Sequence, residues 1–130
     1  MIGLGVDIIQ ISSFEKQLQD RASVFISQSF TQQEIRYANQ HVSNRPSQHL
    51  AARYAAKEAF LKAWSSLNRG SPPKISQPNF QEIVIHNDSF GRPYIVLLGQ
   101  IASVCNFRSI QLSLSHDGDY AFATVFIEEV

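Results

Sequence analysis

Residues Arg53 to Ala63 read RYAAKEAFLKA, an alanine-rich stretch in the middle of the sequence. Its alanines favour a helix strongly and allow close packing. An apolar stripe extends along the segment at Leu50, Tyr54, Leu61 and Trp64. We therefore expect one long helix, capped by Ser47 and ending near Ser66.

Strands are expected before and after this helix. In residues 2–11 (IGLGVDIIQI), period two puts one row on each face: Ile2, Leu4, Val6 and Ile8 on the first, and Gly3, Gly5 and Asp7 on the second. The second face is nearly bare, so a ligand or another backbone can approach it closely. Towards the C-terminus we expect strands around residues 83–85, 94–98, 110–114 and 120–126, with Asp117-Gly118 as a hairpin turn.

Capping-box spacing indicates two further helix starts, at Ser12 with Glu15 and at Thr31 with Glu34. We expect the second helix to reach about Gln40, with Phe30 and Ile35 as its hydrophobic staple. Residues 41–47 and 68–79 are expected to form loops, and residues 102–107 a short helix. The predicted class is α+β, an antiparallel sheet packed against a long helix and shorter helices, in one domain spanning residues 1–130.

Composition narrows the range of functions. The chain has 11 basic and 11 acidic residues, a balance that argues against a general nucleic-acid binder. The single cysteine, Cys105, permits no intrachain disulfide. The N-terminus lacks a basic region followed by an apolar core, and no apolar run is long enough to span a bilayer. We therefore expect a cytoplasmic protein with no membrane partner.

Asp7, Glu58 and Lys62 are the leading candidates for chemistry. An aspartate inside an apolar strand must be solvated, hydrogen-bonded, paired or bound to a metal. Glu58 and Lys62 are four residues apart on the predicted helix, where they form either a surface ion pair or a metal ligand beside a phosphate-neutralising cation. Magnesium prefers one or two carboxylates, water and phosphate oxygens, so Asp7 would supply its second carboxylate.

Three other charged or titratable residues, Arg53, Lys57 and His116, are weaker candidates for a functional role. Arg53 and Lys57 add positive charge to the helix, where a solvated face is the simpler interpretation. His116 ends a strand before the turn, a position that suits either a structural hydrogen bond or a ligand contact. The sequence contains no Walker-type glycine loop, zinc spacing or nucleophile elbow.

The order of several segments resembles the holo-acyl-carrier-protein synthase family of short, bacterial-type phosphopantetheinyl transferases. These segments are Gly5–Ile8, Phe30-Thr31 with Glu34, Arg53–Ala59, Lys62-Ala63, Gly91–Pro93 and Ser113–His116 before Tyr120-Ala121. The resemblance covers nearly the whole chain and implies the 4′-phosphopantetheinyl transferase fold. It also implies transfer of the 4′-phosphopantetheine of coenzyme A to a serine of apo acyl carrier protein, for fatty-acid biosynthesis.

The resemblance implies roles for the three leading candidates. Asp7 and Glu58 match the magnesium-binding carboxylates of the family. Glu58 is also the expected base for the carrier serine. Lys62 matches a lysine that neutralises the pyrophosphate or protonates the leaving adenosine 3′,5′-bisphosphate.

The resemblance further implies a binding site shared between subunits. His116 matches a histidine near the nucleotide phosphates, and Arg53 and Arg45 match positions near coenzyme A or the carrier. Members of the family form homotrimers with sites at subunit interfaces. We therefore expect a neighbouring chain to complete the site.

Ser12 and Ser13 depart from the family pattern, which has basic residues there to dock the acidic carrier helix. Docking is then expected to be weaker, or to rely on Lys16, Arg21 and Arg45. Two alternatives stay open: a transferase for a specialised, polyketide-type carrier, and a carrier-binding module that has lost catalysis. The presence of both carboxylates and the lysine argues against the second alternative.

Overall fold

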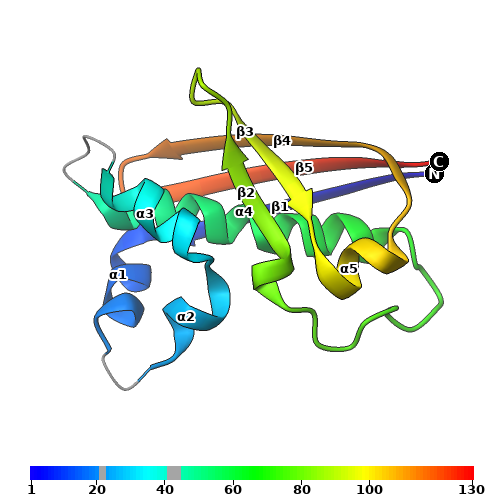
Figure 1. The fold of residues 1–130 in the computed structure, drawn as a ribbon, viewed down its shortest axis with the longest axis horizontal. Helices are drawn as coiled ribbons and strands as arrows, with labels where there is room; N and C mark the ends of the chain where they lie inside the picture. The colour runs from blue at the N-terminus through cyan, green and yellow to red at the C-terminus, as the bar shows by residue number, and fades with distance from the viewer. Residues whose placement is uncertain (21–22, 41–44) are drawn as a thin grey trace.

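The computed structural model describes residues 1–20, 23–40 and 45–130. Its central element is α4 (Pro46–Ser66), which lies between two antiparallel sheets (Figure 1). One sheet has three strands in the order β1 (Ile2–Gln10), β5 (Tyr120–Glu129) and β4 (Phe107–Asp117). The other is the hairpin of β2 (Ile83–Asn87) and β3 (Pro93–Leu97). The predicted α+β class is confirmed.

Shorter elements surround this framework. They are α1 (Ile11–Gln19), α2 (Phe25–Ser29), α3 (Gln32–Gln40), the 3-10 turn η1 (Phe80–Glu82) and α5 (Gly99–Val104). The two chain ends lie side by side (Figure 1), where the Glu129 amide donates to the Met1 carbonyl over 3.0 Å. Within the described ranges, every helix is too short or too polar to cross a membrane.

The close approach of β1 to α4 explains the bare face of the strand. A Cβ atom added to Gly5 would lie 2.0 Å from the Ala59 carbonyl oxygen, and one added to Gly3 would lie 2.3 Å from that of Ala63. Any side chain at these glycines would therefore force the strand away from the helix. The prediction that another backbone approaches this face is confirmed.

The opposite face of β1 is apolar and exposed. Ile2, Leu4, Val6 and Ile8 are each between 46% and 62% exposed. Phe122 of β5, the register partner of Ile8, continues the same face and is 39% exposed. The three-stranded sheet therefore packs on α4 with one face and leaves an apolar face uncovered in the single chain.

Lys57 and Arg53 do not form a solvated face, so that interpretation is wrong. Lys57 is fully buried, and its ammonium donates to Glu34 Oε1 and the Ser29 carbonyl, each over 2.7 Å, and to the Phe80 carbonyl over 3.0 Å. Burial lowers the pKa of Lys57, and the Glu34 carboxylate opposes that shift. Arg53 is only 3% exposed. Both cations of α4 are therefore enclosed within the fold.

The capping box at Thr31 and Glu34 is confirmed. The Thr31 amide donates to Glu34 Oε1 over 2.8 Å, and the Glu34 amide donates to Thr31 Oγ1 over 3.2 Å. Glu34 also accepts from the Ile85 amide over 3.0 Å. One carboxylate thus caps α3, binds β2 and neutralises the cation of α4.

Other predicted boundaries were wrong. Ser12 lies inside α1, where its amide and hydroxyl donate to Asp119 over 3.0 and 2.5 Å, so it does not cap the helix. The start of α4 is at Pro46, and Ser47 donates its hydroxyl to Glu15 instead of capping. The helix α5 begins at Gly99, earlier than expected, and α2 had no sequence signal. Residues 41–44 of the predicted polar loop lie outside the described residues.

Candidate active site

The first cluster of candidate residues forms where β1 passes over α4. Asp7 follows Gly5 on the face of β1 that touches the helix, and its side chain is 16% exposed. Lys62 Nζ lies 3.0 Å from Asp7 Oδ1 and 3.1 Å from the Val6 carbonyl. The lysine is therefore paired with the strand, whereas the sequence suggested an ion pair with Glu58. Glu58 lies one helical turn before Lys62 and is half-buried.

Tyr54 belongs to the same cluster, although the sequence suggested only a place in the apolar stripe. Its ring stacks on Phe80 at 5.3 Å and packs against Phe25 at 5.1 Å. Burial and the nearby charges of Glu58 and Asp7 raise the pKa of Tyr54 to about 12, and its side chain hydrogen-bonds Glu58. Tyr54 is therefore a protonated donor to a carboxylate. Its spacing of four residues from Glu58 was the available sequence signal.

The donor set of this cluster fits a magnesium ion. Among the described residues, no group of three or more His, Cys, Asp or Glu side chains could hold a metal ion. A protein cage for zinc or calcium needs more ligands than two carboxylates. Magnesium retains water and takes substrate phosphates, so Asp7 and Glu58 suffice for it.

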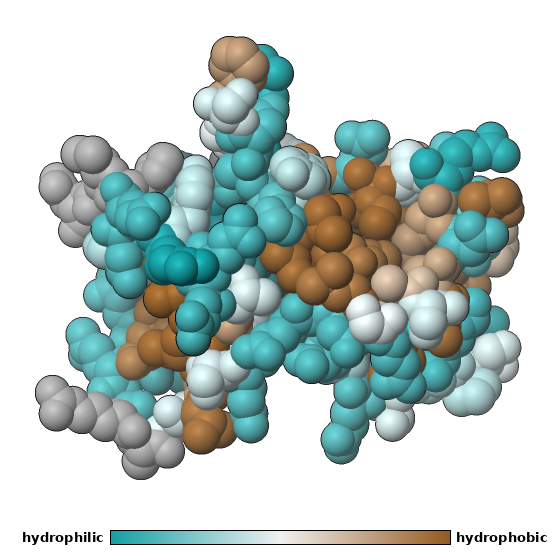
Figure 2. All heavy atoms as spheres, in the orientation of Figure 1, coloured by the Kyte–Doolittle hydropathy of each residue, from teal (hydrophilic) through white to brown (hydrophobic). Residues whose placement is uncertain are grey.

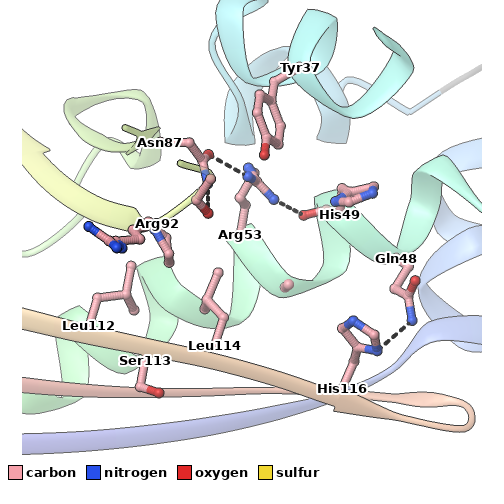
Figure 3. A pocket seen from close by; sticks show the side chains of 13 residues that line it. Tyr37, Gln48, His49, Arg53, Asn87, Arg92, Leu112, Ser113, Leu114 and His116 are labelled. Carbon is pink, nitrogen blue, oxygen red and sulfur yellow. Dashed lines mark hydrogen bonds between the residues drawn. The ribbon is translucent and has the colours of Figure 1, made fainter. Parts of the chain in front are cut away.

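A second cluster lines a cavity of ≈ 520 Å³ on a different face of α4 (Figure 3). Arg53 precedes Glu58 by five residues, which rotates the two side chains about 140° apart around the helix. The cavity walls come from α3, α4, the β2–β3 hairpin and β4, and include Tyr37, Gln48, His49, Arg53, Arg92 and His116. We call this cavity the hairpin pocket. The single chain therefore does not bring Arg53 and His116 together with Asp7 and Glu58.

Arg53 is held tightly at the base of the hairpin pocket. Its Nη1 donates to the His49 carbonyl over 3.0 Å, and its Nη2 donates to Asn87 Oδ1 over 2.6 Å. The guanidinium lies 4.4 Å from the centre of the Tyr37 ring. Its Nε is buried and is the one such side-chain atom in the described part without a hydrogen-bond partner. Burial lowers the pKa of Arg53, and a guanidinium group stays protonated in proteins.

His116 lies exposed at the rim of the same pocket. Gln48 Nε2 and His116 Nδ1 are 2.9 Å apart (Figure 3). Because an amide nitrogen only donates, Nδ1 is the acceptor in this contact, which leaves Nε2 to donate. The histidine can thus present a donor to an anionic ligand.

Arg45 lines neither cluster. It forms ion pairs with Glu15 and with Asp119, the latter over 3.1 Å, and so connects the start of α4 to α1 and the β4–β5 turn. These contacts lower the pKa of Glu15, chiefly through the hydrogen bond from Arg45. Arg21, the other arginine expected at the docking surface, lies outside the described residues.

Comparisons with known proteins show which proteins this chain resembles in sequence. The model of the 4′-phosphopantetheinyl transferase superfamily matches residues 3–125. A holo-[acyl-carrier-protein] synthase from Corynebacterium glutamicum (strain ATCC 13032) is 42% identical over 130 residues, covering 95% of this chain and 96% of that protein. The one from Nocardia farcinica (strain IFM 10152) is 40% identical over 129 residues, covering 99% and 88%.

Solved structures show the same likeness. A structure described as a Chronobacterium ammoniagenes ACPS-CoA complex superposes with a TM-score of 0.91 at 38% identity, covering 100% of this chain and 98% of that one. The acyl carrier protein synthase of Mycobacterium tuberculosis gives a TM-score of 0.79 at 35% identity, covering 98% and 97%.

Proposed function

Because the chain belongs to the 4′-phosphopantetheinyl transferase superfamily, we propose that Asp7, Glu58 and Lys62 form its catalytic centre. The activity is transfer of the 4′-phosphopantetheine of coenzyme A to a serine of apo acyl carrier protein, which releases adenosine 3′,5′-bisphosphate. One observation carries the residue assignment. Lys62 Nζ lies 3.0 Å from Asp7 Oδ1 and one helical turn from Glu58, so both carboxylates and a cation meet at one place.

Each residue of this centre has a chemical task. Asp7 and Glu58 would hold magnesium, which when bound stabilises the negative charge of the pyrophosphate. Glu58 accepts the proton of the carrier serine, whose hydroxyl oxygen forms the new bond to the phosphorus of phosphopantetheine while the pyrophosphate P–O bond to adenosine 3′,5′-bisphosphate breaks. Lys62 neutralises the pyrophosphate and can donate a proton to the departing bisphosphate. Tyr54 keeps its own proton and orients the Glu58 carboxylate.

We assign the hairpin pocket to the nucleotide end of coenzyme A. His116 and Arg92 offer donors and positive charge at its walls, which suits a phosphate on the ribose. Arg53 contributes positive charge from its base. For Arg45 the ion pairs with Glu15 and Asp119 favour a role in shaping the α1 surface that meets the carrier.

We further propose a homotrimer in which two subunits share each site. Two observations support it: the apolar outer face of β1 is uncovered, and the two clusters lie on different faces of α4. An exposed apolar patch on a sheet marks an interaction surface. Asp7, Glu58 and Lys62 of one subunit would then face the hairpin pocket of its neighbour.

For the carrier, we propose the acyl carrier protein of fatty-acid synthesis in the cytoplasm. The alternative of a specialised carrier rests on Ser12 and Ser13, whose hydroxyls bind Asp119 and Gln10 and present no positive charge. The alternative of an inactive carrier-binding module is weakened by the pairing of Asp7 with Lys62 beside Glu58.

Intact-mass spectrometry of apo acyl carrier protein tests the assignment, with coenzyme A and magnesium present. We expect the carrier to gain one phosphopantetheine, and EDTA to prevent the gain. Glu58→Gln should abolish it while keeping the fold, and Glu129→Gln, at the far end of β5, is the matched control. Near-normal turnover by Glu58→Gln would refute the role of Glu58. Equal rates on several unrelated carriers would remove the case for a specialised one.

A further inference from the structure

The β2–β3 hairpin projects from the body of the protein (Figure 1) and ends in a turn that is fixed internally. Asp88 Oδ1 accepts from the Phe90 amide over 2.9 Å and from the Arg92 amide over 2.8 Å. Gly91 completes the turn with a φ of 81°. Figure 2 shows an apolar group at the hairpin tip, where Phe90 is 79% exposed. The turn is thus one rigid unit, and its position depends on how it is joined to the body.

Asn87 makes that join through both ends of its amide. Its Oδ1 accepts from Arg53 Nη2 over 2.6 Å, and its Nδ2 donates to the Gly91 carbonyl over 3.1 Å (Figure 3). An asparagine amide offers one acceptor and one donor group, and here both are used. A single side chain therefore connects the guanidinium on α4 to the hairpin turn.

Arg53 depends on Asn87 for its orientation. The side chain is 3% exposed, and its other terminal nitrogen is held by the His49 carbonyl. A buried guanidinium that loses one of these acceptors must turn to find another. Gly91, Arg92 and Pro93 form the opposite wall of the pocket. Loss of the Asn87 amide would therefore release both the Arg53 guanidinium and the Gly91–Pro93 wall of the pocket.

We infer that Asn87 is a positioning residue for nucleotide recognition, holding Arg53 and the Gly91–Pro93 wall in the arrangement that receives the 3′-phosphate of coenzyme A. This inference rests on the proposed function of the hairpin pocket. Coenzyme A carries a pyrophosphate and a 3′-phosphate. The pyrophosphate is assigned to the centre at Lys62, so the cations of the hairpin pocket are left for the 3′-phosphate.

Calorimetric titration with adenosine 3′,5′-bisphosphate and with 5′-AMP tests this without turnover. Asn87→Ala should weaken the bisphosphate roughly tenfold, the scale of one hydrogen bond to a charged group, and 5′-AMP much less. Asn68→Ala is the matched control, because it also removes one hydrogen bond from an asparagine amide to a backbone carbonyl, that of Trp64. It should bind both ligands as the unaltered protein does.

The outcomes separate this inference from the pocket assignment. If the unaltered protein does not bind the bisphosphate, the pocket assignment fails and the inference fails with it. If it binds, and Asn87→Ala binds equally well or loses both ligands equally, only the role of Asn87 is overturned. If Asn87→Ala fails to fold, Asn87→Asp provides a second test. It keeps an acceptor for Arg53 but offsets the positive charge, so it should also lose bisphosphate affinity.

Two further readouts distinguish positioning from general support of the fold. Asn87→Ala should raise the KM for coenzyme A with little change in kcat, because the catalytic centre lies on another face of α4. Hydrogen exchange of residues 88–92 should accelerate, since the tether at Gly91 is lost. A fall in kcat at constant KM, or unchanged exchange in the turn, would overturn the inference.

Discussion

Lys57 Nζ donates to Glu34 Oε1 over 2.7 Å, and neither side chain is exposed to solvent. The pair connects α4 to the start of α3, at the residue directly before Glu58. Removing one partner leaves the other charge buried without compensation. This ion pair is therefore expected to control the stability of the fold around the site.

Lys57→Met should destabilise the protein by about 3–5 kcal/mol in urea unfolding. The double variant Lys57→Met with Glu34→Gln should recover part of that loss, because the orphaned carboxylate is replaced by a neutral amide. Lys74→Met, a lysine of the 68–79 loop, is the control and should change stability little. A change below about 1 kcal/mol in Lys57→Met would contradict this account.

Gly5→Ala should destabilise the fold by about 3 kcal/mol or more, because its Cβ would meet the Ala59 carbonyl at 2.0 Å. Gly70→Ala has open space but a φ of 81°, so it should cost only about 1–2 kcal/mol. Thermal unfolding of both variants measures the two losses of stability. Equal losses would show that β1 can move away from α4 without penalty.

Lys62→Ala should lower kcat by about 10²–10³, the scale seen when one donor to a developing charge is removed. Its thermal stability should hardly change, because the side chain is 55% exposed. The matched control is Lys74→Ala, which should retain full activity. A raised KM with normal kcat would assign Lys62 to substrate binding alone.

The proposed sharing of each site between two subunits predicts complementation between two inactive variants. Glu58→Gln lacks the catalytic centre, and His116→Ala lacks part of the hairpin pocket. Co-expression should restore activity at about a quarter of the sites, since random assembly pairs the two intact halves that often. Absence of recovery from mixed oligomers, verified by native mass spectrometry, would place both halves in one subunit.

The contacts of Asp119 predict that the folded protein loses stability in acid. Hydrogen bonds from Ser12 and then from Arg45 lower its pKa below the ordinary value of 3.8. A carboxyl group with a depressed folded-state pKa stabilises the fold above its unfolded pKa and loses that effect as pH falls. Melting temperatures should therefore drop below about pH 4 in the unaltered protein and drop less in Asp119→Asn. Parallel curves would contradict the contribution of Asp119.

Local patterns predicted the main elements of the fold. The alanine-rich segment predicted α4, the alternation in residues 2–11 predicted β1 with its correct faces, and Thr31 with Glu34 predicted the start of α3. Each of these signals lies within one element. The capping box predicted at Ser12 and Glu15 is absent because a distant residue binds the same backbone. The carbonyl and carboxylate of Asp119 accept from the amides of Ile11 and Ser12.

Long-range relationships explain the remaining errors. The burial of Lys57 depends on Glu34, which lies 23 positions earlier in the sequence, and no local spacing reveals such a partner. The same applies to Asp7 and Lys62, 55 positions apart. The separation of Arg53 from Glu58 could have been predicted from the sequence, because a spacing of five residues places them on different faces of the helix. The assignment of residues to the two halves remains a prediction.

The alternation of β1 gives one strand two separate duties. Its odd positions, Gly3, Gly5 and Asp7, face α4, and its even positions, Ile2 to Ile8, face outwards. Inserting or deleting one residue would exchange the two rows, sending the carboxylate outwards and isoleucines into the space reserved for glycine. Relatives of this protein should thus vary the identity of the outward residues freely as apolar types, while the spacing of Gly3, Gly5 and Asp7 within the strand tolerates no change.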